Sequence, residues 1–321
     1  MPLADFKSLP VTVTGGAGFI GSHLTHALVA AGADVLVLDN FSHGSQQNLA
    51  PLAGKITVQT GDIRNPADCD QATRGRAVVF HLAALGSVPR SVAEPLLYNE
   101  VNIGGTLNVL EAARKNGVKR LVYSASSSAY GDTPVLPKIE TMVPAPKSPY
   151  AVTKLTGEHY CRAFSSVYGL STFCLRYFNV FGPRQNPNSQ YAAVIPAFVA
   201  ALLKGQRPRI FGDGEQTRDF CFIHNVVNAN LLAGSHSSQL NGEVANIACG
   251  QRISLNAMLA LMQKQLGTNI APEYLPPRAG DVRDSLADIT AAKTLIGYRP
   301  EVLFAEGLRI TVNAYSNRTG E

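Results

Sequence analysis

The chain has 321 residues, of which 45% are apolar, and its formal net charge is +5. This length fits one large domain or two unequal ones, and no apolar run approaches the about 20 residues that a membrane helix requires. The mild positive charge, without a long basic run, does not indicate nucleic-acid binding and suits a site for an anionic small molecule. The first residues lack the basic-then-apolar pattern of a signal peptide, so we expect a cytoplasmic protein that binds neither membrane nor nucleic acid.

The cysteines are odd in number and scattered, and none of them forms a CxxC pair: Cys69, Cys161, Cys174, Cys221 and Cys249. Such spacing indicates neither a disulfide framework nor a zinc site, and no metal is expected. We therefore predict that each cysteine is a small residue of the core.

The first predicted element is a short, apolar and β-branched strand at residues 11–14, of the kind buried in parallel sheets. It leads into a glycine-rich turn at residues 15–21, which a helix over residues 22–32 follows. A second strand is expected at residues 34–39. The order strand, turn, helix and strand is typical of a dinucleotide-binding unit.

The glycine spacing of that turn supports the same interpretation. Gly15 permits the tight turn, Gly18 lets the backbone approach a pyrophosphate, and Gly21 lets the helix pack on the strand. Asp39 ends the second strand, where a carboxylate binds the adenosine ribose hydroxyls. A 2′-phosphate would meet a like charge there, so the sequence predicts NAD rather than NADP.

Strands and helices continue to alternate through the first half of the chain. Strands are expected at residues 56–60, 77–84, 120–124 and 171–177, and helices over about 99–116 and from Tyr150 onward. Repeated βαβ units imply a parallel, doubly wound α/β sheet whose ligands bind beyond the carboxyl ends of the strands. Asp39, Asp62, Ala83 and Ser126 all follow such ends, so we expect them on one face.

Tyr150 and Lys154 stand four residues apart, so on a helix they share a face. An ammonium beside a phenol favours the anionic form, so we expect the pKa of Tyr150 to fall. The hydroxyl of Ser126 can hold the oxygen of the reacting group, and this set can move a proton on and off an alcohol near neutral pH. The alternative is an ordinary amphipathic helix with an exposed tyrosine and lysine.

From Asn179 onward proline and glycine become dense and the alternation ends. We predict an NAD-binding domain over residues 1–178 and a smaller substrate domain over residues 179–321. Later segments near residues 220–248 are expected to return to the first domain.

Two arginines of this second half are candidates for a diphosphate site, because guanidinium groups grip diphosphates bidentately. They are Arg218 and Arg278. Local pairing of Arg218 with Asp219, and of Arg278 with Asp281, is the alternative.

Taken together, these motifs resemble the extended short-chain dehydrogenase/reductase family, in particular its NAD-dependent nucleotide-sugar epimerases and dehydratases. The motifs that carry the resemblance span nearly the whole chain: residues 15–21, 61–63, 81–84, Ser126 with Tyr130 and Gly131, Tyr150 with Lys154, 175–183, 218–220 and 278–281. Residues 84–91 and 191–196 are most similar to those of UDP-N-acetylhexosamine 4-epimerases. The resemblance implies a Rossmann-type doubly wound sheet with a second, smaller α/β domain, bound NAD, a UDP-sugar substrate, a homodimer, and a role in polysaccharide biosynthesis.

The resemblance also implies a cofactor site, in which Asp39 binds the adenosine ribose and Lys154 holds the nicotinamide ribose. The residues of this site are Gly15, Gly18, Phe19, Ile20, Gly21, Asp39, Asn40, Asp62, Ile63, Leu82, Ala83, Ala84, Tyr150, Lys154 and Tyr177. UDP-galactose 4-epimerases often have a lysine at the position of Gly86, so a contact to the cofactor phosphates is expected to be missing here.

By the same resemblance, Tyr150, Lys154 and Ser126 are the catalytic residues, and Asn179, Arg218, Arg278 and Asp281 hold the UDP moiety. The whole implied substrate set is Ser87, Ser126, Ser127, Ser128, Tyr150, Asn179, Ala193, Val194, Arg209, Phe211, Arg218, Arg278, Asp281 and Ser285.

The reaction type depends, in this family, on the residues beside Ser126. Hexose 4,6-dehydratases carry Thr-Asp-Glu just upstream of the Tyr-Gly pair, and UDP-glucuronate decarboxylases carry a glutamate near that position. This chain has Ser127 and Ser128 there, which supply no carboxylate for an elimination. The resemblance therefore implies reversible C4 epimerisation through a 4-keto sugar; a dehydratase or reductase and a non-catalytic NAD-binding protein are the alternatives.

Substrate breadth depends on a position seven residues after Arg278, which acts as a gate beside the sugar C2 in this family. Ser285 stands there and is small enough to admit an N-acetyl group, so UDP-GlcNAc and UDP-GalNAc are the expected substrates. UDP-glucose and UDP-galactose are the alternative pair. Uronic acid forms stay open, with Arg90 as a candidate partner for the carboxylate.

Overall fold

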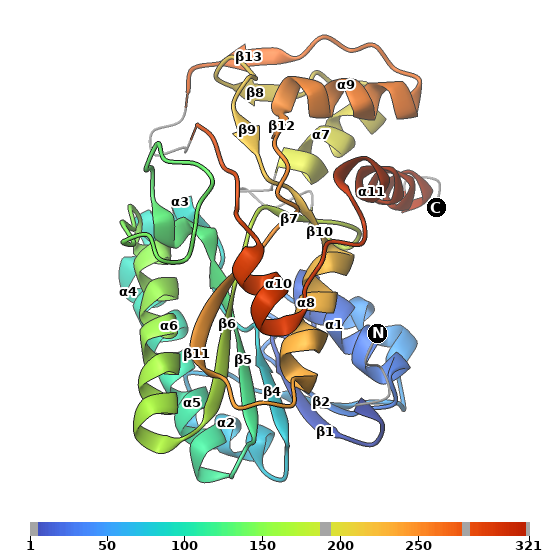
Figure 1. Cartoon of the computed structure of the whole chain (residues 1–321). Coiled ribbons are helices and arrows are strands. Elements are labelled where there is room, and N and C mark those ends of the chain that lie inside the picture. The colour runs from blue at the N-terminus through green and yellow to red at the C-terminus, as the bar shows by residue number, and fades with distance from the viewer. Residues whose placement is uncertain (1–5, 187–193, 278–282, 319–321) are drawn as a thin grey trace.

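The computed structural model of the chain describes residues 6–186, 194–277 and 283–318. Its centre is a seven-stranded parallel sheet with the order β11-β6-β5-β4-β1-β2-β3 (Figure 1). The strands are β1 (Pro10–Thr14), β2 (Asp34–Asp39), β3 (Thr57–Thr60), β4 (Val78–His81), β5 (Arg120–Ser126), β6 (Ser171–Tyr177) and β11 (Asn241–Ile247).

Helices cover both faces of this sheet. On one face α1 (Phe19–Ala30) packs with α8 (Ile223–Ser235), and on the other lie α2 (Pro66–Thr73), α5 (Gly105–Lys115) and α6 (Pro149–Tyr168). The predicted doubly wound α/β fold is therefore confirmed.

The strand β2 shows why these segments are apolar throughout. Val35 and Val37 pack into the core on the α1 and α8 side, whereas Leu36 and Leu38 pack into the core on the α2 and α5 side. Successive side chains of a strand point to opposite faces, so a sheet covered on both sides requires apolar residues at every position.

The first helix begins earlier than predicted, at Phe19 rather than at residue 22, and it ends at Ala30. The reason is that Gly18 already adopts the extended conformation of an N-cap, and its carbonyl accepts the Ser22 N–H. The helix expected over about residues 99–116 starts with a π-helical turn, Asn99–Gly104, which continues directly into α5.

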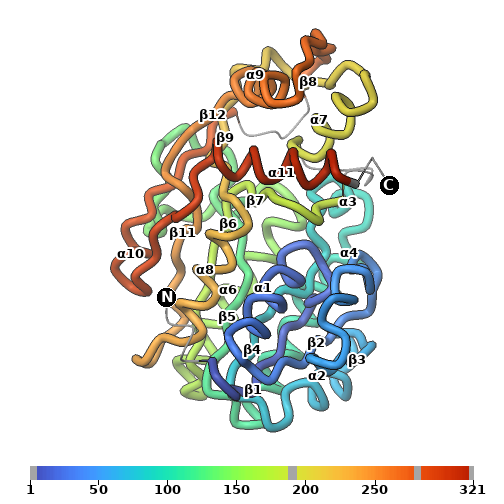
Figure 2. Tube along the Cα trace, turned by 90° about the vertical axis from the view of Figure 1, so that its right-hand side faces the viewer, coloured from blue at the N-terminus to red at the C-terminus, as the bar shows by residue number. Residues whose placement is uncertain are grey.

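A second lobe lies beyond the carboxyl ends of the strands, at the top of Figure 1, and Figure 2 shows α11 running beneath α9 there. Its elements are β7 (Val180–Phe181), α7 (Val194–Leu203), β8 (Arg209–Phe211), β9 (Thr217–Arg218), β10 (Cys221–Phe222), β12 (Ile253–Ser254), α9 (Leu255–Leu266), β13 (Glu273–Leu275) and α11 (Phe304–Arg318). The helix α10 (Thr290–Ile296) instead packs against β11 and α8 of the sheet layer. The short elements left are η2 (Gln46–Asn48), η3 (Ala50–Leu52), α3 (Val88–Ala93), α4 (Pro95–Tyr98) and η5 (Ser127–Tyr130).

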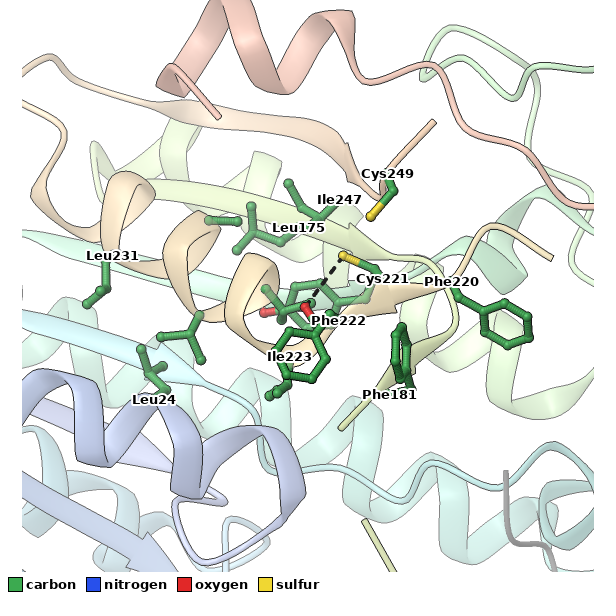
Figure 3. Packing of buried hydrophobic residues seen from close by; sticks show 14 of the residues in the cluster. Leu24, Leu175, Phe181, Phe220, Cys221, Phe222, Ile223, Leu231, Ile247 and Cys249 are labelled. Atoms are coloured by element: carbon green, nitrogen blue, oxygen red, sulfur yellow. Dashed lines mark hydrogen bonds between the residues drawn. The ribbon is translucent and has the colours of Figure 1, made fainter. Parts of the chain in front are cut away.

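Aromatic side chains join this lobe to the sheet. The ring of Phe181 lies 6.1 Å from Phe220, 5.5 Å from Phe222 and 5.5 Å from Phe304, measured between centroids. Figure 3 shows three of these rings beside core residues of the sheet layer, and all belong to one continuous core cluster. The second lobe is therefore packed onto the sheet layer rather than linked to it by a hinge alone.

All five cysteines are buried free thiols, which confirms their prediction as core residues. Within the described ranges, each helix is too short or too polar to cross a lipid bilayer.

His81, the last residue of β4, is a buried group whose pKa makes stability depend on pH. Its Nδ1 lies 2.7 Å from the Thr14 hydroxyl and its Nε2 lies 2.9 Å from the Thr106 hydroxyl. Burial, with a smaller contribution from the Lys154 ammonium, lowers the pKa of His81 to about 3. The folded protein therefore holds this imidazole neutral at any pH near 7.

We expect the free energy of unfolding to fall as the pH drops below 6.5, because the unfolded chain then binds a proton at His81 that the folded protein does not. The loss is about 1.4 kcal/mol per pH unit, or about 2 kcal/mol by pH 5. Urea unfolding at pH 7 and pH 5 measures it. The His81→Gln variant is expected to be less stable at pH 7 but to lose less between the two pH values; an equal loss in both proteins would contradict the assignment.

Candidate active site

Three glycines shape the turn between β1 and α1, and at two of them a Cβ would clash with backbone atoms. Gly15 has a φ of +70°, and a Cβ there would lie 2.8 Å from the Ala83 nitrogen. A Cβ on Gly21 would lie 2.1 Å from the Gly15 carbonyl oxygen. Gly18 caps α1 without a side chain, and the first turn holds no acidic residue, so its N–H groups can face an anion.

Asp39 stands beside this turn at the end of β2. Its Oδ2 accepts the Ala17 N–H at 2.9 Å and its Oδ1 accepts the Phe41 N–H at 2.8 Å. These two bonds fix the carboxylate at the mouth of the cavity described below. A fixed carboxylate there can accept two ribose hydroxyls and repels an added phosphate.

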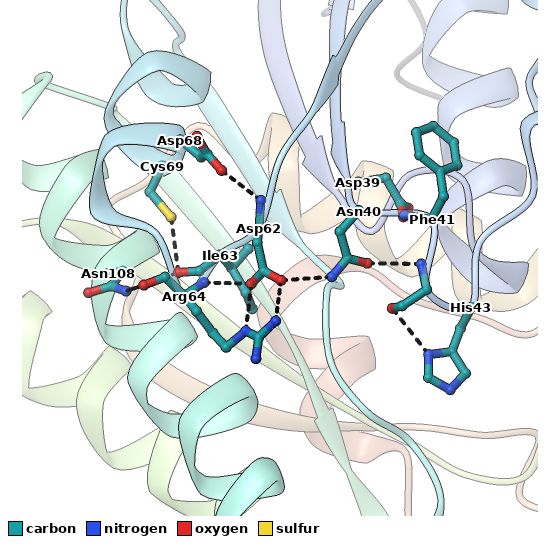
Figure 4. Close-up of polar contacts among 11 residues, drawn as sticks. Asp39, Asn40, Phe41, His43, Asp62, Ile63, Arg64, Asp68, Cys69 and Asn108 are labelled. Carbon is teal, nitrogen blue, oxygen red and sulfur yellow. Dashed lines mark hydrogen bonds and ion pairs between the residues drawn. The ribbon is translucent and has the colours of Figure 1, made fainter.

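A polar network extends from Asp39 across the end of β3 (Figure 4). The Asn40 side chain donates to Asp62 at 2.9 Å, and Arg64 donates to the same carboxylate from Nε at 3.0 Å and Nη2 at 2.8 Å. The hydrogen bonds from Arg64 hold the pKa of Asp62 well below its ordinary value. This carboxylate is therefore ionised, and a hydrogen-bond acceptor, near pH 7.

A cavity of about 660 Å³ runs along the carboxyl ends of the strands. It brings together every residue that the sequence predicted for the cofactor: Gly15, Gly18, Phe19, Ile20, Gly21, Asp39, Asn40, Asp62, Ile63, Leu82, Ala83, Ala84, Tyr150, Lys154 and Tyr177. Lining residues that the sequence did not indicate for the cofactor include Ser42, His43, Gly44 and Arg64 from loops and Arg90 from α3.

These residues fit a dinucleotide. The uncapped first turn of α1 offers N–H donors for a pyrophosphate, and Asp39 offers acceptors for a ribose. The volume is in the range of ordinary cofactor sites. Gly86 lines this cavity, and a Cβ there would meet no atom within 4 Å.

The helix α6 positions the predicted catalytic pair at the inner end of this cavity. Its N-cap is Ser148, whose side chain accepts the Ala151 N–H at 3.2 Å. Lys154 is buried, its Nζ donates to the Ser124 carbonyl at 2.7 Å, and burial lowers its pKa to about 8. At pH 7 this lysine is therefore still mostly protonated.

Tyr150 differs from the prediction in the direction of its pKa. Burial raises the pKa of the Tyr150 phenol, and a hydrogen bond with Ser126 offsets only part of that rise. The predicted fall through Lys154 is wrong, because its ammonium donates to the backbone of β5, and water is withdrawn from the phenol. The four-residue spacing of Tyr150 and Lys154 reveals neither the burial of the phenol nor the hydrogen bond of the lysine to the backbone.

A second cavity, of about 840 Å³, adjoins the first at Tyr150 and Tyr177. It is lined by the end of β5 and η5 on one side and by the second lobe on the other. Predicted substrate residues that it brings together are Ser126, Ser127, Ser128, Tyr150, Asn179, Arg218 and Ser285. Two neighbouring cavities that share Tyr150 suit a cofactor and a substrate that react with each other.

The second-lobe side of this cavity is held by polar contacts. Arg218 donates from Nη1 to the Thr217 carbonyl at 2.9 Å and to the Arg283 carbonyl at 2.8 Å. Asp219 is buried and accepts the backbone N–H groups of Cys249, at 2.9 Å, and of Gly250, at 3.0 Å. That carboxylate therefore organises the chain after β11.

Other predicted substrate residues do not line this cavity. Ser87 caps α3, with its hydroxyl accepting the Arg90 N–H, and Arg209 is exposed on β8, 3.2 Å from Glu273. Val194 and Phe211 lie elsewhere in the second lobe, and Ala193, Arg278 and Asp281 fall outside the described residues.

Arg90, the candidate partner for a uronate, lines the first cavity and not the second. Its guanidinium pairs with Glu94 at 3.0 Å and lies 3.3 Å from the His43 ring nitrogen. The structure therefore does not bring Arg90 to the sugar side of Tyr150.

Comparisons with known proteins agree with this arrangement. Residues 11–248 match the model of the family described as the NAD dependent epimerase/dehydratase family. The chain is 39% identical over 314 residues to a UDP-glucose 4-epimerase of Mycolicibacterium smegmatis, covering 96% of this chain and 98% of that one.

The chain is also similar to two solved structures. One, at 42% identity and a TM-score of 0.93 over 97% of this chain and 99% of that one, is a UDP-N-acetylglucosamine 4-epimerase from Methanobrevibacter ruminantium in complex with UDP-N-acetylmuramic acid. The other, at 37% identity and a TM-score of 0.86 over 95% and 98%, is a Thermus thermophilus UDP-glucose 4-epimerase in complex with NAD.

Proposed function

The chain belongs to the NAD-dependent epimerase/dehydratase family and is an NAD-dependent UDP-sugar 4-epimerase, and we propose that it interconverts the C4 epimers of UDP-N-acetylhexosamines. The observation that carries the N-acetyl preference is Ser285. This small residue lines the second cavity, which we call the sugar-side cavity. Its hydroxyl accepts a hydrogen bond from the Asn179 side chain at 3.4 Å. It leaves space beside the sugar that a bulky side chain would fill.

In this proposal the substrate lies in the second cavity with its C4 hydroxyl between Tyr150 and Ser126. Tyr150 removes the hydroxyl proton and later returns it, and Ser126 orients the oxygen. NAD supplies a reversible hydride acceptor at this point. Lys154 would hold the nicotinamide ribose, and the positive charge of the oxidised cofactor would stabilise the phenolate form that burial disfavours.

The residues proposed to bind the cofactor and those proposed to bind the substrate belong to different parts of the chain. We propose that the layer of residues 1–178, with α8 and β11, binds NAD, and that the second lobe binds the UDP moiety through Asn179 and Arg218. Both residues line the second cavity and not the first. A guanidinium there suits a diphosphate.

Elimination or decarboxylation would need a further carboxylate beside the sugar that is free to act as acid or base. In the described part of the chain, the one carboxylate among its lining residues is that of Asp284, which accepts hydrogen bonds from the Thr217 amide and hydroxyl. Ser126, Ser127 and Ser128 occupy the other side. The arrangement favours simple reversal of the oxidation, which is epimerisation.

Product analysis tests the proposal. The protein is incubated separately with UDP-GlcNAc, UDP-GalNAc, UDP-glucose and UDP-galactose, and the products are separated by chromatography. We expect interconversion of the first pair with a higher kcat/KM than that of the second pair. Loss of water, steady consumption of NADH, or a preference for the plain hexoses would each contradict it.

Substitution of the gate residue gives a second test. Ser285→Tyr is expected to reduce kcat/KM for UDP-GlcNAc by on the order of 10²-fold, because the ring overlaps the N-acetyl group, while UDP-glucose turnover is retained. The matched control is Ser285→Ala, which keeps the space open and should keep the N-acetyl activity. Undiminished turnover of UDP-GlcNAc by the tyrosine variant would refute the gate.

We further propose that two copies pair through the outer faces of α5 and α6. On α6, Val152, Val167 and Tyr168 are exposed by 46%, 68% and 54%, an unusual exposure for large apolar side chains on one helix. Light scattering that gives the mass of a monomer would contradict this.

A further inference from the structure

The sugar-side cavity contains a lysine that the epimerisation does not use. Lys147 lines it together with Ser148 and Tyr150, just ahead of the first turn of α6. In the described part of the chain its polar partner is Asp132, at 3.4 Å, with side chains that are 61% and 49% exposed. An ion pair so long and so exposed contributes little, so it can be exchanged for another anion.

The other charged groups of this cavity are engaged by the protein itself. Lys138 is buried and donates to the carbonyls of Thr133 and Val135. Arg218 donates to two backbone carbonyls, and the Asp284 carboxylate accepts a hydrogen bond from the Thr217 N–H. Lys147 differs because its charge is balanced only by a distant and solvated carboxylate.

We propose that Lys147 binds a carboxylate carried by the hexose of the UDP-N-acetylhexosamine. This rests on the proposed function, because that function places the sugar C4 at Tyr150. Lys147 precedes Tyr150 by three residues and lines the same cavity, so we place its ammonium beside the sugar rather than beside the UDP group. An ammonium facing a carboxylate in a partly enclosed cavity gives a charge-assisted hydrogen bond.

Two positions on the sugar can present that carboxylate. The neighbours of C4 are C3 and C5, so the acid group is either the oxidised C6 attached to C5 or an acid joined through the oxygen of C3. Both place the same chemical group beside C4. In either case the ligand displaces Asp132 from Lys147, and the Asp132 carboxylate opposes binding through like charge.

The test compares binding of three ligands by isothermal titration calorimetry: UDP-GlcNAc, its 6-carboxylate, and its 3-O-lactyl derivative. We expect the wild-type protein to bind at least one acid more tightly than UDP-GlcNAc. In Lys147→Gln the ratio of the acid and neutral affinities is expected to fall about ten-fold, which corresponds to about 1.4 kcal/mol. The acid whose ratio falls identifies the position of the carboxylate. In Asp132→Asn the same ratio is expected to rise.

The matched control is Lys115→Gln. Lys115 is also 61% exposed and pairs with a carboxylate, Glu111, at 3.2 Å, but it lines neither cavity. The proposal is overturned if wild-type protein does not prefer either acid, if Lys147→Gln leaves the ratio unchanged, or if Arg90→Gln lowers it instead. Failure to epimerise UDP-GlcNAc would refute the proposed function. The ratios of the acid and neutral affinities test the role of Lys147 independently of turnover.

Discussion

Replacing Tyr150 by phenylalanine is expected to lower kcat for UDP-GlcNAc by about 10²–10⁴-fold, the usual contribution of a positioned acid–base group. Both cavities share the phenols of Tyr150 and Tyr177, but the Tyr177 hydroxyl is engaged by Ser124 and Asn230, whereas the Tyr150 phenol is hydrogen-bonded to Ser126. Phenylalanine keeps the ring, and with it the edge-to-face contact with Tyr98, whose centroid lies 6.5 Å away. The fold and the NAD content should therefore be preserved.

Steady-state kinetics with both UDP-N-acetylhexosamines measure this effect. Tyr160→Phe is the matched control, because Tyr160 lies on the same helix, packs against the core and lines neither cavity. It should turn over at nearly the wild-type rate. If Tyr150→Phe retained kcat within about three-fold of wild type, a different residue would have to move the proton.

Gly21→Ala is expected to remove bound NAD and to lower the melting temperature. Its Cβ would lie 2.1 Å from the Gly15 oxygen, 2.8 Å from the Gly15 carbonyl carbon and 2.9 Å from the Gly16 Cα. All three are backbone atoms, so no side chain can rotate away, and the turn itself must move. Overpacking of this kind costs about 1–3 kcal/mol and displaces the N–H groups that would face the pyrophosphate.

Released nucleotide, quantified by chromatography after denaturation of the purified protein, measures the loss. Differential scanning calorimetry measures the change in melting temperature. The control is Gly104→Ala, another glycine in a helical segment, where a Cβ would meet no atom within 4 Å. Gly21→Ala protein that keeps its NAD and its melting temperature would show that the turn tolerates a side chain.

The sequence allowed the sheet to be predicted because its strands are buried on both faces and its helices are periodic. The cofactor residues were found for a similar reason. Gly15, Gly21 and Asp39 are required by local backbone geometry, and that geometry leaves a fixed spacing in the chain. The start of α1 was misplaced because a glycine N-cap has no side chain that marks it.

Other parts of the site depend on packing that spacing does not encode. His43 lines the cofactor cavity from a loop and Arg90 from the short helix α3, and Lys147 joins the second cavity although it belongs to no recognised motif. The pKa of Tyr150 was predicted in the wrong direction, because burial of the phenol and the Ser124 carbonyl that holds Lys154 arise only in the folded chain.

The return of β11 and α8 to the sheet constrains how such a protein can be recombined. β11 pairs with β6 although the chain has by then built only the first part of the second lobe, and α8 covers the same face as α1. A chimaera made by one crossover near residue 178 would combine an edge strand and a covering helix from one parent with a sheet from another. Exchange of the sugar-recognising part between relatives therefore requires at least three junctions, near residues 179, 222 and 248, so that Phe181 and Phe222 come from one parent, and α10 must then still match the β11 and α8 on which it packs.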